Sequence, residues 1–425
     1  MLEKNLAKLL NDAFGDDARR KDSLMLCRGF SGEVPVNNAQ AAKVLGVMHS
    51  THGNKSFTRE RVRLLLLAAV GRKVEADNGE LVWEKDPKGN PLGILPYLEA
   101  SSWRSTKLEK AIALLESVAP VSADTAIELL KKYKLTEIDF HPSALIAVAN
   151  TLEQPCQLAI QKYAGNHFVV IAGQKTEIVT NAKGETKQEL IPDAILKSAT
   201  KRVIADGACS VSSLVDLIPV KQGISAEEAT KLRKLHSEFV RDLVETSAGC
   251  TWLDSDLEWF FFNRPCRNRV VTKLQQLFAV VEGELPTTEV VEAIDQSYKE
   301  YSGQTRVIPD DILISLTEIV ADCRLVTRDG VDYLFTRSRE SLQETLTEDM
   351  KHIVEFLSKN PMSREHAMRE ELVTKRGVIS NPVLVMRIFY SPFTKRPKPG
   401  QYVLRGQQAP TRSSKDVKGN QDASA

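Results

Sequence analysis

The sequence predicts a mainly α-helical (α+β) chain with small β-hairpins, built as a tandem array of compact modules. Three observations support this fold class. Amphipathic helical segments dominate the sequence, pairs of short alternating runs follow them, and the same order of elements recurs along the chain. The 425 residues, of which 42% are apolar and 27% charged, suit a soluble globular protein of two to four domains.

The stretch 264–338 shows one module most completely. Apolar residues at helical spacing predict a first helix in NRVVTKLQQLFAVV and a second in TEVVEAIDQSYKEY, after the GELP break. Pro309 and two aspartates open a third helix, where the macrodipole favours acidic side chains. Two alternating runs joined by Asp329 and Gly330 then predict a two-residue hairpin. Three helices followed by a hairpin is the pattern of a winged helix-turn-helix.

The same pattern predicts four winged-helix modules, at 107–173, 192–263, 264–338 and 347–406. Each second helix begins directly after a marker residue, and the markers are separated by 90, 74 and 77 residues. The four markers are Val121, Val211, Leu285 and Met362.

The remaining segments carry weaker patterns. We expect residues 1–100 to form a helical domain with a helix-turn-helix-like segment, beginning with a helix over Leu2 to Phe14. A polar break and a loop follow that helix, and the polar stretch 174–189 is expected to be a linker. Residues 407–425 are expected to be a disordered tail.

Net charge, cysteine content and hydropathy limit the kinds of partner and compartment that the sequence predicts. The net charge is +1, so any nucleic-acid contact must come from local basic patches rather than from a chain-wide field. The six cysteines form no C-x-x-C pair, which favours reduced thiols in a cytoplasmic protein. The sequence contains neither a signal peptide nor eighteen consecutive apolar residues, so no membrane span is expected. His49 and His52 are interpreted as part of a solvated loop rather than half a metal site.

The sequence lacks the motifs of several common enzyme classes. It contains no P-loop, no G-x-G-x-x-G after a strand, no H-E-x-x-H and no G-x-S-x-G. Asp310 and Asp311 could be metal ligands of a nuclease, but helix-start acids explain them more simply. We therefore expect a non-enzymatic protein with no cofactor and no metal, and keep a metal-dependent nuclease as a weaker alternative.

The third helices separate the modules by their capacity to read DNA. A groove-reading helix needs Arg, Lys, Asn or Gln on its outer face. HPSALIAVANTL has no Lys or Arg and is expected to be core or a protein-contact face, and PDDILISLTEIVADC carries four carboxylates that would repel phosphates. NPVLVMRIFYS carries Arg387 alone. The aromatic cluster of Trp252 and 259–262 is interpreted as the inner face of a wing, with base stacking as the less favoured alternative.

Four basic clusters are predicted to contact phosphates. They lie in the N-terminal helix-turn-helix-like segment, the third helix of the second module, the RPCRNR stretch with Lys273, and the last wing. A solvated helix face is an equal alternative for the second cluster, and an interdomain salt-bridge hub is one for the third. The predicted contacts are Arg59, Arg61, Arg63, Lys231, Arg233, Lys234, Arg264, Arg267, Arg269, Lys273, Lys395, Arg396, Lys398 and Arg405.

Two segments resemble known families. SPFTKRPKPGQYVLRG, through Gly400, Tyr402, Leu404 and Arg405, resembles the wing of HARE-type winged helices. AAKVLGV followed by FTRERVRLL resembles the promoter-reading helix-turn-helix of bacterial sigma factors, with the ten residues MHSTHGNKSF inserted in the turn. The matching residues of this second segment are Leu45, Gly46, Val47, Thr58, Arg59, Glu60, Arg61, Val62 and Arg63.

The resemblances imply DNA binding or attachment to the transcription or genome-defence machinery, and they imply no reaction. The leading hypothesis is a DNA-binding protein of tandem winged helices that contacts the phosphate backbone. The alternative is a protein-docking scaffold in a DNA-associated complex, such as RNA polymerase, a chromosome-organising ATPase or an antiviral defence system.

Overall fold

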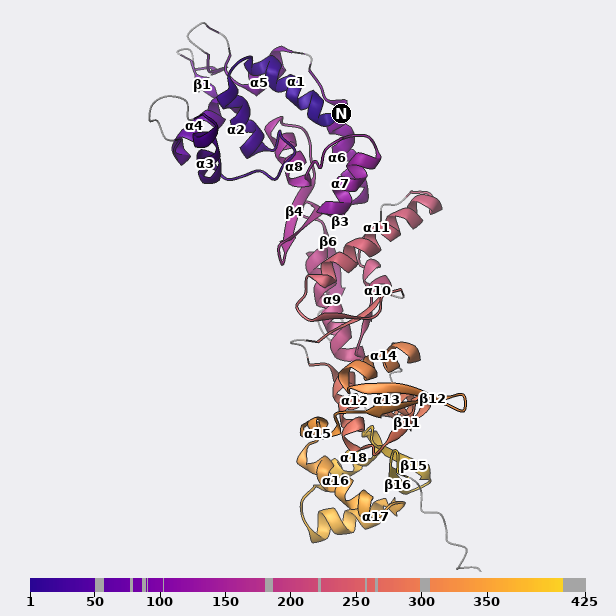
Figure 1. Ribbon diagram of the computed structural model, residues 1–425. Helices are drawn as coiled ribbons and strands as arrows, with labels where there is room; N and C mark the ends of the chain where they lie inside the picture. The colour runs from indigo at the N-terminus through magenta and orange to yellow at the C-terminus, as the bar shows by residue number, and fades with distance from the viewer. Residues whose placement is uncertain are drawn as a thin grey trace, which may run out of the picture. The chain divides into compact units, whose positions relative to one another are not determined.

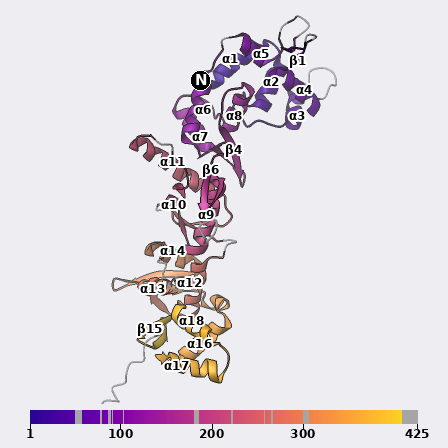
Figure 2. The same cartoon turned by 180° about the vertical axis from the view of Figure 1, so that it is seen from behind.

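The structure is a computed structural model of the chain, and it confirms the predicted fold class. It describes residues 1–49, 57–76, 79–85, 89, 91–101, 103–179, 186–220, 223–256, 258–263, 267–298 and 306–407. Helices dominate, and small antiparallel sheets of two or three strands accompany them (Figure 1; Figure 2 gives the opposite side). In the part of the chain described, no helix has the length and apolar character needed to cross a membrane.

The chain forms two compact units. The first consists of Met1–Ala194 and Val215–Thr246, and the second of Ile195–Leu214 and Ser247–Ala425. The module predicted at 192–263 is therefore divided, because its longest helix belongs to the first unit and its sheet to the second.

The first unit begins with the predicted helix α1 (Leu2–Phe14). The polar break expected after it is wrong, because Ala18–Arg28 forms helix α2, with Asp17 accepting a hydrogen bond from the Arg20 amide as the N-cap. Only Ser23, Leu24 and Cys27 of α2 are buried, so its apolar stripe is too thin to be recognised from periodicity. Tertiary contacts make this segment helical.

Helix α2 packs against both helices of the predicted helix-turn-helix-like segment. These helices are α3 (Asn38–Met48) and α4 (Arg59–Val70), and the hairpin of β1 (Lys73–Glu75) and β2 (Leu81–Trp83) follows them. Three helices and a hairpin make this segment a further winged-helix-like unit, whereas the sequence predicts only a helix-turn-helix-like segment. Helix α5 (Ile94–Ala100) completes the segment.

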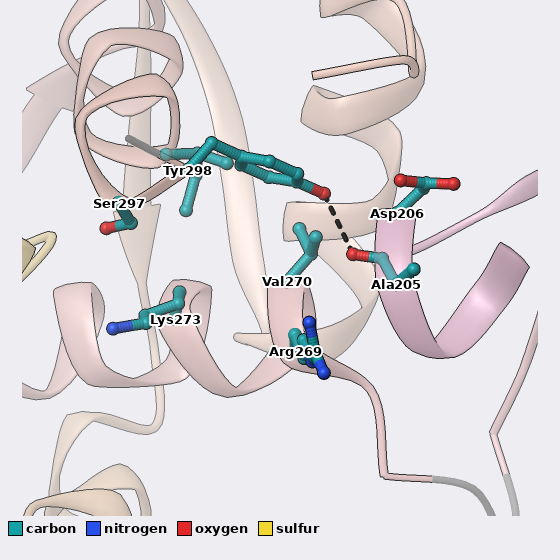
Figure 3. A pocket seen from close by; sticks show the side chains of 8 residues that line it. Ala205, Asp206, Arg269, Val270, Lys273, Ser297 and Tyr298 are labelled. Atoms are coloured by element: carbon teal, nitrogen blue, oxygen red, sulfur yellow. Dashed lines mark hydrogen bonds between the residues drawn. The ribbon is translucent and has the colours of Figure 1, made fainter. Parts of the chain in front are cut away.

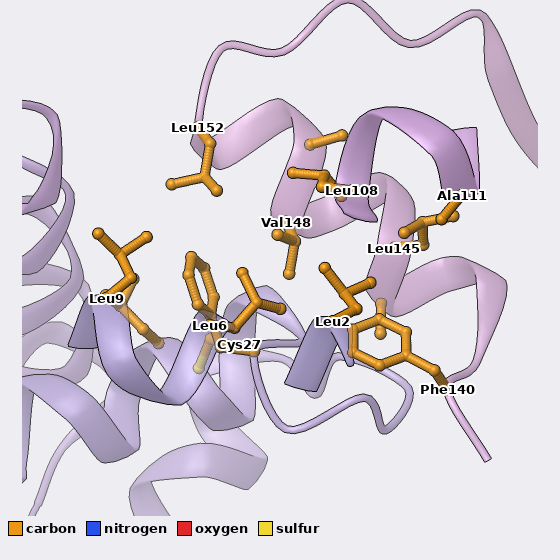
Figure 4. Packing of buried hydrophobic residues seen from close by; sticks show 14 of the residues in the cluster. Leu2, Leu6, Leu9, Cys27, Leu108, Ala111, Phe140, Leu145, Val148 and Leu152 are labelled. Atoms are coloured by element: carbon orange, nitrogen blue, oxygen red, sulfur yellow. The ribbon is translucent and has the colours of Figure 1, made fainter. Parts of the chain in front are cut away.

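The next winged-helix-like unit shares its core with the N-terminal helices (Figure 4). Its third helix is buried between α1, α2 and α6, which agrees with the core role expected for HPSALIAVANTL. The elements are α6 (Thr106–Val118), β3 (Val121–Ser122), α7 (Ala123–Lys132), α8 (Pro142–Thr151), β4 (Leu158–Tyr163) and β5 (Asn166–Ile171).

The stretch expected to be a linker is partly structured. Strands β6 (Lys175–Val179) and β7 (Thr186–Leu190) form a two-stranded antiparallel sheet. Most of the described side chains on these strands are not buried, so the strands show no alternation of apolar and polar residues. The sequence therefore gives no signal for this hairpin.

The winged-helix-like unit at 192–263, which is divided between the two compact units, comes next in the chain. Its order of elements matches the predicted plan, and it also contains a short strand before the second helix. The elements are α9 (Ile191–Asp206), β8 (Cys209–Ser210), α10 (Val211–Val215), α11 (Ala226–Glu245), β9 (Cys250–Asp254) and β10 (Trp259–Phe262). Phe260, Phe261 and Phe262 are buried, which supports the inner-face interpretation of the aromatic cluster over base stacking.

The second unit contains two further winged-helix-like units joined by α15 (Arg339–Leu342) and η1 (Gln343–Thr345). The first has α12 (Arg269–Val280), β11 (Glu284–Pro286), α13 (Thr287–Tyr298), α14 (Asp310–Val320), β12 (Cys323–Arg328) and β13 (Val331–Thr336). The second has α16 (Glu348–Lys359), β14 (Ser363–Arg364), α17 (Glu365–Met368), η2 (Arg369–Lys375), α18 (Asn381–Tyr390), β15 (Thr394–Lys398) and β16 (Gln401–Leu404).

One sheet topology recurs in four of these units. The strand orders are β3-β5-β4, β8-β10-β9, β11-β13-β12 and β14-β16-β15. In each sheet the return strand of the wing lies in the middle and pairs with a short strand that precedes the second helix. These short strands lie at or beside the markers found in the sequence, so the repeated pattern reflects repeated winged-helix-like units.

Candidate nucleic-acid interface

Helix α4 presents arginines to solvent because its opposite face is core. Val62, Leu66 and Ala69 are buried, and Thr58 caps the helix by accepting a hydrogen bond from the Arg61 amide at 3.2 Å. Arg59 is exposed at the first position of the helix, and Arg63, next to Val62, is exposed as well. The first turn of the helix therefore combines cationic side chains with free backbone N–H groups, which favours anions.

The three arginines of α4 differ in their partners. The Arg63 guanidinium donates to both carboxylate oxygens of Glu60 at 2.7–3.1 Å, and this hydrogen bonding lowers the pKa of the Glu60 carboxyl. The Arg61 guanidinium lies 4.8 Å from the centre of the Phe57 ring. Among the described residues, no carboxylate forms an ion pair with Arg59. Arg59 is thus the cation of this cluster with the fewest competing contacts.

Two further exposed lysines lie on elements of the same segment, and neither is predicted from the sequence. Lys43 is exposed on α3, the helix that packs against α4. Lys73 begins the β1–β2 hairpin, where its ammonium lies 4.7 Å from the centre of the Trp83 ring and 3.7 Å from Glu99. Recognising the hairpin as a wing would have suggested Lys73, because wings commonly contact the backbone beside the groove-reading helix. Lys43 stands alone in the sequence and Lys73 has only Arg72 beside it, so neither belongs to a dense basic cluster there.

On α11 the predicted cations are exposed but partly neutralised. Lys231 pairs with Glu227 at 2.6 Å, and Arg233 pairs with Asp216 at 2.8 Å. Lys234 is exposed, and within the described part of the chain no acidic group pairs with it. Surface pairs of this kind contribute little and exchange readily, so these residues remain available to phosphates. The balancing acids also match the alternative of a solvated helix face.

A small pocket lies at the start of α12, and Arg269 of the RPCRNR cluster lines it (Figure 3). Arg264 lies outside the described residues, and Arg267 is exposed. Arg269 and Lys273 line a pocket of about 40 Å³ together with the Asp206 carboxyl, whose pKa burial raises. This volume holds a few water molecules and no nucleotide base.

Asn268 anchors the start of α12. Its amide side chain donates to the Gly207 carbonyl at 2.7 Å and accepts from the Val271 amide at 3.0 Å. Gly207 is required there, because a Cβ at this position would lie 2.7 Å from the Cβ of Val270. Part of the motif is therefore a helix cap, and Asn268 holds α12 against the end of α9.

The wing of the last winged-helix-like unit divides into structural and exposed cations. Lys395 pairs with Glu289 at 2.8 Å, and the Arg405 guanidinium lies 3.7 Å from Glu289 and 3.6 Å from Glu292, both on α13. Arg405 is only 4% exposed, so a phosphate group cannot reach it as predicted. It fixes the wing to α13 instead. Arg396 and Lys398 are exposed and remain candidates.

Two acidic residues of helix α14 have structural roles. The Arg306 side chain, largely buried, pairs with Asp295 at 2.9 Å and with Asp310 at the start of α14. The carboxylate of Asp310 is therefore used to hold α14 against α13. Glu318 accepts a hydrogen bond from the Leu325 amide at 3.3 Å.

His236 links α11 to the rest of the first unit. Its ring is 1% exposed and lies beside the backbone of Val118 and Ala119, and burial lowers the pKa of the imidazole to about 4, against the opposing effect of that backbone. A histidine with a depressed pKa stabilises the folded state fully above its unfolded pKa of about 6.5, and the stabilisation falls as the pH drops toward 4.

We expect His236 to make the first unit acid-sensitive. Between pH 7.5 and pH 4 the wild-type protein should lose about 3 kcal/mol of unfolding free energy that a His236→Leu variant does not lose. Urea unfolding of both proteins across this range measures the difference, and the other titrating groups cancel in the comparison. Parallel pH profiles for the two proteins would contradict the assignment.

Comparison of the chain with protein-family models, curated protein sequences and solved structures gives no match.

Proposed function

We propose that this protein binds double-stranded DNA through its N-terminal winged-helix-like unit, with little dependence on base sequence. The observation that carries the proposal is the exposed arginine pair at the start of α4, with Lys43 on the neighbouring helix and Lys73 on the wing. In winged helices and helix-turn-helix proteins the third helix enters the major groove by its N-terminal end. Arg59 and Arg63 occupy that end of α4.

The third helices of the other winged-helix-like units differ from α4 in their suitability for DNA contact. Helix α8 is buried and α14 begins with acidic residues, so neither helix is suited to enter the major groove of DNA. Exposed cations on α11 and at Arg396 and Lys398 would add phosphate contacts without reading bases. The resemblance of α3 and α4 to the sigma-factor helix-turn-helix, and of the last wing to HARE-type winged helices, agrees with a role in transcription or genome defence.

The test is a duplex-binding titration with charge reversal on α4. We expect wild-type affinity for a 20-base-pair duplex to fall steeply between 50 and 200 mM salt, and Arg59→Glu to weaken binding equally for unrelated sequences. Glutamate is favourable in the first turn of a helix, so the variant should remain folded. Fluorescence anisotropy measures both effects.

Arg19→Glu is the matched control, because Arg19 is an exposed arginine on α2 of the same unit. It changes the net charge by the same amount and should leave duplex affinity nearly unchanged. Absence of duplex binding by the wild-type protein at 50 mM salt, or equal losses in the two variants, would remove the DNA function.

A second candidate function, docking of a protein partner, is favoured by apolar residues on the same two helices. Val47 at the end of α3 is 78% exposed, and Met48 and Leu64 are about half exposed. Large apolar side chains exposed on two helices that pack together favour a protein-interaction site. A stoichiometric partner retained after nuclease treatment by the wild-type protein, and lost with Val47→Glu, would favour the scaffold role over DNA binding.

A further inference from the structure

The sheet β11-β13-β12 has one core face and one solvent face. Residues directly opposite each other across paired strands point to the same side. Leu285, Leu334 and Leu325 are cross-strand neighbours, and the first two are fully buried, which defines the core face. The alternate residues lie on the other side. We call this the outer face, and its members are Glu284, Pro286, Arg324, Val326, Arg328, Val331, Tyr333 and Phe335.

The outer face is apolar and aromatic along its middle strand. Val331, Tyr333 and Phe335 follow one another at every second position of β13, and Phe335 is 41% exposed while Val331 is 42% exposed. Solvent-facing positions of an antiparallel sheet are normally polar. Such an apolar row bordered by charged residues indicates an interaction surface rather than a core.

Two arginines border this row on β12. Arg324 lies opposite Phe335, and Arg328 lies opposite Val331 and pairs with Glu284 at 2.8 Å. No acidic residue in the described ranges forms an ion pair with Arg324, which is exposed. With Glu284 as the one acid on the outer face, the face as a whole is positive.

We propose that the outer face binds single-stranded nucleic acid. Tyr333 and Phe335 are spaced by about 6.6 Å along the strand, which allows each ring to stack on its own unpaired base. Arg324, about 5 Å away opposite Phe335, and Arg328, diagonal to Tyr333 at about 7–8 Å, meet the phosphates that follow those bases. Aromatic rings combined with adjacent cations are the features of sequence-tolerant single-strand binding sites.

This inference goes beyond the proposed duplex binding, since it involves other residues, another unit and another form of nucleic acid. A duplex hides its base faces by stacking, so aromatic rings on a sheet surface cannot stack on them. The two sites would let one chain hold duplex and unpaired strand at once.

The test uses the full chain and fluorescently labelled 12-nucleotide single strands of DNA and of RNA, with anisotropy as the readout. We expect Phe335→Ala to weaken single-strand binding by about 5- to 150-fold, the range for loss of one stacked base. Tyr333→Phe should keep wild-type affinity, because the ring remains. The two labelled strands show whether the site prefers DNA or RNA.

Leu325→Ala is the matched control, because Leu325 is similarly exposed on the core-facing side of the same hairpin. It should leave single-strand affinity unchanged, and Arg59→Glu should weaken only duplex binding. Equal effects of Phe335→Ala and Leu325→Ala would overturn the proposal, as would full competition by a duplex. Concentration-dependent self-association that requires Phe335, without single-strand binding, would assign the face to protein contact instead.

Discussion

Replacing Gly29 with alanine will destabilise the first unit by about 2–5 kcal/mol. Gly29 ends helix α2 in the left-handed conformation, at φ +73°, where an alanine costs about 1–2 kcal/mol. A Cβ at this position would also lie 2.5 Å from the Cα of Ala144 on α8. The obstructing atom is backbone, so relief requires α2 and α8 to separate, at an overpacking cost of about 1–3 kcal/mol.

Gly165→Ala is the control for the conformational part of this loss. Gly165 also has a positive φ, +91°, in the β4–β5 turn of the same unit, but a Cβ there meets no atom within 4 Å. We expect the Gly165→Ala substitution to lower the unfolding free energy by about 1–2 kcal/mol. Urea unfolding followed by circular dichroism compares the variants, and faster hydrogen exchange across α8 should accompany Gly29→Ala alone. Equal midpoints would show that α2 and α8 do not depend on this close approach.

Arg405→Ala is expected to destabilise the second unit by about 2–4 kcal/mol, although the sequence suggests a phosphate-binding residue. Removing one member of a buried ion pair leaves its partners without compensation, which costs about 3–5 kcal/mol when they are fully buried. Glu289 is partly exposed and Glu292 largely so, which lowers the expected loss. Gln296, which accepts a hydrogen bond from Arg405 at 3.0 Å, also loses its partner.

Lys398→Ala tests the opposite behaviour on the same wing. Lys398 is exposed, so its replacement should change the unfolding free energy by less than about 0.5 kcal/mol. It should lower the salt dependence of duplex binding by about one unit of slope, whereas Arg405→Ala should leave that slope unchanged. Thermal unfolding and the salt titration together measure both properties. A stable Arg405→Ala protein with a reduced slope would restore Arg405 to the phosphate contacts.

These effects follow from a modular fold whose third helices serve different purposes. Helix α8 has become core, with Gly29 and Ala144 at the crossing, and α14 is held by Arg306 through its acidic first turn. Among the third helices, only α4 and α11 present several exposed cations in the described residues. The repeated architecture therefore does not imply a repeated DNA-binding function.

The sequence by itself determined the repeated element order and most of the helices, because amphipathic periodicity and turn residues are local signals. The marker residues before the second helices lie at or beside short strands, and the Asp329–Gly330 turn joins a real hairpin. The sequence also predicted that the α8 segment, which lacks any Lys or Arg, would be core or a protein-contact face, and the structure places it in the core.

The tertiary structure decided the features that leave no periodic pattern of apolar residues in the sequence. Helix α2 buries too few apolar residues to be recognised alone, and the β6–β7 hairpin has no apolar alternation, so contacts made elsewhere in the chain specify both. The same holds for charge. Arg405 and Lys398 are seven residues apart on one wing and look alike in the sequence, yet one is buried against α13 and the other faces solvent. Whether a cation is structural or free depends on which residues from distant parts of the chain surround it, and only the fold brings those residues together.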